Sequence, residues 1–134
     1  MAATLESQLL RANAAFYEAF SNGDIEAMDE LWASGIEVAC IHPGWQALRG
    51  RDEVMAGWRA ILLGGNAPKI ECTDALTIPL GDSSGLVICT EWIDGADLAA
   101  TNAFVRENGL WHLAHHHAGP VTRVLETPDP GLLN

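Results

Sequence analysis

The turn signals in the second half of the chain constrain its fold most strongly. Short segments rich in Gly, Asp and Asn, at 81–85, 94–95 and 108–109, separate runs of apolar and β-branched residues. Segments of this kind are typical of β-hairpins. They predict antiparallel strands joined in a meander. The expected strands are Ile70–Leu80, Leu86–Ile93, Leu98–Arg106 and Leu110–His117.

The first half of the chain has a helical pattern instead. From Leu5 to Phe20 apolar residues recur every three or four positions, and an Asn-Gly pair then supplies a stop. Asp24 is placed to cap a short second helix, and Arg51–Leu63 has the apolar stripe of a third. One strand, Ile36–Ile41, is expected between them. Helices followed by a meander predict an α+β fold, with three N-terminal helices packed on one face of a mainly antiparallel sheet.

Length and charge limit the function classes. The 134 residues suit one domain, 1–134, with a core at about 8–120 and a tail at 121–134. The net charge of −11 would repel nucleic acid. No apolar run reaches the roughly 18 residues of a membrane helix, and the first residues lack the pattern of a signal peptide. We therefore expect a cytoplasmic protein with no nucleic-acid and no membrane partner. Its three cysteines, Cys40, Cys72 and Cys89, are expected to be buried, reduced thiols.

The register of the last hairpin follows from its turn. A two-residue turn at Asn108-Gly109 would place Asn102 opposite His115, and strand alternation puts His117 on the same face. The larger side chains lie on this face, so we expect the helices to cover it. The alternate residues His112 and His116 are then expected on the outer face.

The orientation of Glu91 depends on the turn that follows it. A two-residue or a four-residue turn around Asp94-Gly95 places Glu91 on the face of Asn102, whereas a three-residue turn points it outward. If buried among its apolar neighbours, Glu91 would have a raised pKa and could act as an acid or base near neutral pH. If it faces outward, it would be solvated or paired with an arginine.

Three stretches of the sequence have the character of one known family. They are the helical opening at 14–24, the Ile-His-Pro-Gly-Trp segment at 41–45 leading into 48–54, and the closing hairpin at 101–106 and 109–117. Together they resemble the nuclear transport factor 2-like (NTF2-like) superfamily, and its SnoaL-like branch in particular. The resemblance implies a cone-shaped fold whose strongly curved sheet encloses a pocket. It also implies a homodimer formed through the outer sheet face.

The same resemblance suggests where the chemistry lies. Enzymes of this superfamily, which include cyclases, isomerases, dehydratases and an epoxide hydrolase, use a pocket carboxylate, often with His or Tyr. We predict Glu91 and His115 as catalytic residues, because each can move a proton near neutral pH. The residues predicted to bind ligand are Tyr17, His42, Trp45, Trp58, Asn102 and His117. Each also has a purely structural explanation, such as packing in the core or hydrogen bonding to the backbone.

Two functional hypotheses follow. The first is a SnoaL-like small-molecule-binding protein with an internal apolar pocket. If it is an enzyme, it would be a cofactor-independent isomerase, dehydratase or cyclase that transfers a proton on a carbonyl compound. The second is a non-catalytic ligand-binding or dimerisation domain, whose pocket its own side chains fill. No metal is predicted: His115 and His117 with His42 or Glu91 could bind zinc or iron, but His-x-His on a strand is unspecific. An open cavity holding a group of displaced pKa would favour the enzyme.

Overall fold

The computed structural model describes residues 3–65 and 69–122. These residues form three helices and one six-stranded sheet with the order β2-β1-β6-β5-β4-β3. Neighbouring strands are antiparallel except β1 and β6, which are parallel. The elements are α1 (Leu5–Ser21), α2 (Ile25–Leu31), β1 (Ala39–Ile41), β2 (Leu48–Arg49), α3 (Gly50–Leu62), β3 (Ile70–Gly81), β4 (Ser84–Ile93), β5 (Ala96–Glu107) and β6 (Leu110–Pro120). The predicted α+β class with three helices on a curved sheet is confirmed.

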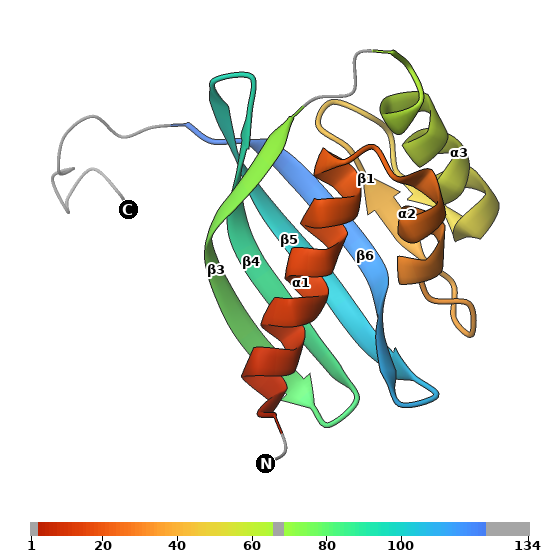
Figure 1. The fold of residues 1–134 in the computed structure, drawn as a ribbon, viewed down its shortest axis with the longest axis vertical. Coiled ribbons are helices and arrows are strands. Elements are labelled where there is room, and N and C mark those ends of the chain that lie inside the picture. The colour runs from red at the N-terminus through yellow and green to blue at the C-terminus, as the bar shows by residue number, and fades with distance from the viewer. Residues whose placement is uncertain (1–2, 66–68, 123–134) are drawn as a thin grey trace, which may run out of the picture.

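The helices form where their caps and apolar stripes predict. The Thr4 hydroxyl accepts a hydrogen bond from the backbone N–H of Ser7, and the Asp24 carboxylate accepts one from Ala27, both at 3.1 Å. Leu9 and Phe16 on α1 are fully buried. Figure 1 shows α1 lying across the concave side of the sheet, with α2 and α3 beside the β1 end.

The two tight turns of the meander have the predicted geometry. Ile93 pairs with Ala96 and Glu107 pairs with Leu110, so each turn has two residues. Asp94 (φ 50°) and Asn108 (φ 52°) begin these turns in the left-handed region, each followed by a glycine with positive φ. The first turn therefore puts Glu91 on the same face as Asn102, as a two-residue turn predicts.

The last strand departs from regular alternation. Phe104 pairs with Leu113 as the turn predicts, but Ala103 then pairs with His115, so Ala114 is an extra residue in β6. This bulge shifts the pairing by one, and Asn102 lies opposite His116. The predicted facing of His115, His116 and His117 is therefore wrong.

Smaller expectations also need correction. The strand expected at Ile36–Ile41 is limited to Ala39–Ile41, and the two-residue β2 that pairs with it was not predicted. Of the tail expected at 121–134, all but the first two residues lie outside the described part of the chain. No helix in the described ranges is long and apolar enough to cross a membrane.

Candidate functional site

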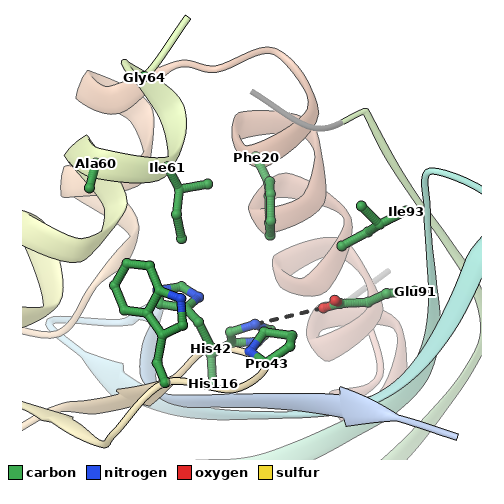
Figure 2. Close-up of a pocket in the computed structure, with 10 residues that line it drawn as sticks. Phe20, His42, Pro43, Ala60, Ile61, Gly64, Glu91, Ile93 and His116 are labelled. Atoms are coloured by element: carbon green, nitrogen blue, oxygen red, sulfur yellow. Dashed lines mark ion pairs between the residues drawn. The ribbon is translucent and has the colours of Figure 1, made fainter. Parts of the chain in front are cut away.

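A cavity of about 400 Å³ opens between the helices and the concave side of the sheet. Its walls are mostly apolar, and three polar side chains, those of His42, Glu91 and His116, reach it. Figure 2 shows Glu91 and His116 pointing toward one another, with Phe20, Ile61 and Ile93 around them. The lining residues are Phe20 of α1, His42, Pro43 and Trp45 after β1, Ala60, Ile61 and Gly64 of α3 and its end, Glu91 and Ile93 of β4, and His116 of β6. Such a site suits a small, largely apolar molecule with one polar end.

Four buried side chains form a closed ring beside this cavity. Tyr17 donates its hydroxyl hydrogen to Oε2 of Glu91 at 2.6 Å, and Nδ2 of Asn102 donates to the Tyr17 hydroxyl at 3.1 Å. Nδ1 of His116 lies 2.5 Å from Oδ1 of Asn102. Nε2 of His116 lies 3.7 Å from Oε2 of Glu91, which closes the ring. These contacts come from α1, β4, β5 and β6, so the whole fold holds the ring in place.

The hydrogen-bonded ring of side chains fixes which imidazole nitrogen of His116 carries the proton. Nδ2 of Asn102 donates to Oδ1 of Asn13 at 2.8 Å as well as to Tyr17, so the amide oxygen faces His116. An amide oxygen can only accept, and Nδ1 of His116 must therefore be the donor. In the neutral imidazole this leaves a lone pair on Nε2, the nitrogen that faces Glu91. His116 is thus presented as a base next to a carboxyl group.

Burial shifts the pKa values of this pair in opposite directions. It raises the pKa of Glu91, although the hydrogen bond from Tyr17 opposes the shift. Burial also lowers the pKa of His116 well below its usual value, with nearby His42 adding to the effect. The pKa of His42 falls to about 4 for the same reason. Both imidazoles are consequently neutral at neutral pH, so the 3.7 Å contact joins Glu91, whose pKa is raised, to a neutral base and not to a fixed positive charge.

Five of the six predicted ligand-binding residues lie in or around the cavity. His42 and Trp45 line the cavity, and their rings lie 4.9 Å apart. Tyr17 and Asn102 lie behind the cavity wall, in the hydrogen-bonded ring of side chains that holds Glu91 and His116. Trp58 does not line the cavity; it is fully buried, and its ring lies 4.7 Å from that of His42. It therefore supports the site by packing.

His115 and His117 are not in the site. The bulge at Ala114 turns both toward the outer face of the sheet, where their rings lie 6.2 Å apart. Nδ1 of His115 contacts the backbone oxygen of Ala39 at 2.9 Å. The prediction that His115 faces Asn102 is wrong, and His116, which was expected outside, takes that position. The metal-ligand set that included His115 and His117 is accordingly not brought together. Within residues 3–65 and 69–122, no three His, Cys, Asp or Glu side chains cluster to hold a metal ion.

Sequence reasoning missed His116 and Asn13. Three consecutive histidines guarantee that a strand turns at least one of them inward, but a bulge decides which one, and no turn residue marks this bulge. Asn13 is 2% exposed on the buried side of α1. A polar residue inside an apolar helical stripe is the signal that could have identified it, because buried amides require partners.

Comparison with known proteins agrees with this architecture. The model of the SnoaL-like domain family matches residues 9–122. A solved structure from Streptomyces avermitilis, described as a candidate dehydratase from the NTF2-like family, is 36% identical, with 87% of this chain and 95% of that chain covered and a TM-score of 0.79. A second, from Thiobacillus denitrificans, described as a candidate association domain of a type II calcium/calmodulin-dependent protein kinase, is 31% identical, with 83% and 93% covered and a TM-score of 0.73.

A curated plant protein is also similar over part of its length. The F-box protein SKIP8 of Arabidopsis thaliana is 26% identical over 111 residues, which are 82% of this chain and 48% of that protein. The chain thus spans about half the length of this relative.

Proposed function

Because this chain belongs to the SnoaL-like domain family of NTF2-like proteins, we propose that it binds a small, largely apolar carbonyl compound in its cavity and transfers a proton on that compound. The observation that carries the proposal is the pairing of Glu91 with His116 at the polar end of the cavity. An acid of raised pKa facing a neutral imidazole lone pair is suited to moving protons.

In this reaction His116 acts as the base and Glu91 as the acid. Nε2 of His116 takes a proton from the carbon next to the carbonyl group, while the carboxyl group of Glu91 gives its proton to the carbonyl oxygen. The product is an enol beside an imidazolium–carboxylate pair. Return of the protons to different atoms completes an isomerisation, and loss of a neighbouring hydroxyl group as water completes a dehydration. Tyr17 supports the carboxylate that forms, because it already donates to Oε2 of Glu91.

The direct test is exchange of carbon-bound hydrogen with solvent. We expect the protein in D₂O to accelerate deuterium incorporation next to the carbonyl group of at least one apolar ketone, such as cyclohexanone or β-tetralone, as followed by NMR. Glu91→Gln and His116→Gln should each reduce the rate by about a hundredfold or more. His115→Gln is the matched control, because this histidine faces away from the cavity.

Two results would count against proton transfer. One is exchange no faster than in buffer with every ketone, although quenching of tryptophan fluorescence shows that a ketone binds. The other is an equal loss of rate in the His115 and His116 variants.

A second function is favoured by the outer face of the sheet. Ile88 and Trp92 of β4 are 37% and 38% exposed there, and Thr101 of β5 lies between Ile88 and His117 of β6. The candidate association domain among the similar structures makes assembly a reasonable role for such a face. We propose that this face forms a homodimer, which is compatible with the cavity because the cavity lies on the other side.

A further inference from the structure

A pair of thiols lies next to the ring of polar side chains and is not needed by the proposed reaction. Cys72 of β3 and Cys89 of β4 are on adjacent antiparallel strands. Cys72 lies directly opposite Glu91, and Cys89 precedes Glu91 by two residues on β4, so the two cysteines are diagonal neighbours. Cys89 is 4% exposed, whereas Cys72 is only half-buried, on a strand at the edge of the sheet. An oxidant from solvent would therefore reach Cys72 first.

Polar contacts hold both sulfur atoms. Nδ2 of Asn13 donates to Sγ of Cys72 at 3.6 Å, and Sγ of Cys89 lies 3.2 Å from the Tyr17 hydroxyl. A hydrogen bond from Cys89 is the largest cause that lowers the pKa of Cys72, whereas the same contact, together with burial, raises the pKa of Cys89. A thiol of lowered pKa thus lies beside a buried thiol of raised pKa, the arrangement of an attacking and a resolving cysteine.

The backbone next to Cys72 can shift enough to bring Cys72 and Cys89 within bonding distance. A disulfide needs Cα atoms within about 7 Å of each other, and diagonal cross-strand neighbours lie about 7–8 Å apart. Closing a bond thus requires a shift of about 1 Å. β3 has a bulge between Thr73 and Leu76, with Asp74 at φ 57°, next to Cys72 on the edge strand. A bulge leaves residues outside the regular ladder and makes such a local shift possible.

We propose that Cys72 and Cys89 are a peroxide-reactive dithiol that closes to an intramolecular disulfide. The Cys72 thiolate attacks hydrogen peroxide, forms a sulfenic acid and releases hydroxide. The Cys89 thiol then displaces the sulfenic oxygen as water, so the two thiols lose two electrons and two protons, and peroxide is reduced to water. Closure also changes the group that faces Tyr17, because the Cys89 sulfur that lies 3.2 Å from the Tyr17 hydroxyl becomes part of a disulfide. In this way oxidation acts on the hydrogen-bonded ring of Tyr17, Glu91, Asn102 and His116.

The test is treatment of the reduced full chain with hydrogen peroxide, followed by intact mass and peptide mapping. We expect the wild type to lose two hydrogen atoms and to yield a Cys72–Cys89 linked peptide, while Cys40 stays reduced. Cys40 is the internal comparison because it is fully buried and burial raises its pKa. Cys89→Ser should give added oxygen on Cys72 with no bridge, and Cys40→Ser should behave as the wild type.

Other outcomes overturn the proposal. They are addition of oxygen to Cys72 without a bridge in the wild type, bridging between two chains, or oxidation of Cys40 as fast as Cys72. The wild-type mapping decides the question even if a serine variant fails to fold. The result is independent of the ketone assay, so a failure of proton transfer and a failure of the dithiol are distinguishable.

Discussion

At the scale of single residues, the site depends on polar groups that burial keeps neutral. His42 is 3% exposed and its pKa is about 4, and the pKa of His116 is also lowered. In the unfolded chain a histidine titrates near pH 6.5. Between these pKa values the unfolded chain binds more protons than the folded one, so the free energy of unfolding must fall as the pH falls.

This linkage gives a prediction for His42. Lowering the pH from about 7.5 to about 5.5 should cost about 1 kcal/mol of stability through His42 alone. His42→Gln should flatten the pH dependence of the free energy of unfolding by that amount, measured by urea denaturation. Glu91 acts in the opposite sense, because its raised pKa adds stability at low pH. It is present in both the wild type and His42→Gln, so the difference between these two proteins reports on His42. His117→Gln, at an exposed position, is the control; an equal flattening there would contradict the assignment.

At the scale of elements, the sequence predicts structure where local chemistry decides it. The Asp-Gly and Asn-Gly turns require left-handed backbone, so their residues determine two hairpins and the inward position of Glu91. The bulge at Ala114 is different. It depends on how β6 meets β5 and β1, and alanine has no preference that marks it. For that reason the sequence predicts the inward position of Glu91 correctly, but it predicts His115 at the position that His116 takes in the structure.

The contact of α1 with β4 gives a prediction at this scale. Gly85 lets the helix approach closely: a Cβ atom there would lie 2.6 Å and 3.2 Å from the two methyl carbons of Leu9, which is fully buried. Gly85→Ala should destabilise the protein by about 1–3 kcal/mol in urea denaturation, because both methyl groups must move in a packed core.

Two further variants test the cause. Gly119→Ala on β6 should have little effect, because nothing lies within 4 Å of its added Cβ. In Leu9→Ala/Gly85→Ala, the effect of the second substitution should largely disappear. A Gly85→Ala cost that is unchanged in the Leu9→Ala background would show that the helix contact is not responsible.

At the scale of the whole molecule, the two faces of the sheet have separate roles in this account. The concave face holds the cavity, and the outer face forms the proposed dimer. Ile88→Lys should convert the dimer to a monomer in light scattering coupled to gel filtration, because a buried interface cannot hold unpaired like charges. Leu110→Lys, at a 66% exposed residue beside the β5–β6 turn, should leave the mass unchanged. A wild-type monomer at micromolar concentration would refute the dimer.

The fold presents His116 as a neutral base with its Nε2 lone pair toward Glu91. Nitrogen NMR of ¹⁵N-histidine-labelled protein measures this directly, with His116 assigned from the His116→Gln spectrum. We predict that Nδ1 is protonated and Nε2 unprotonated at about pH 6.5, where half of ordinary imidazoles would carry both protons. We also predict that the Nε2 signal shifts when β-tetralone binds. A His116 ring that titrates near pH 6.5, or one that carries its proton on Nε2, would contradict it.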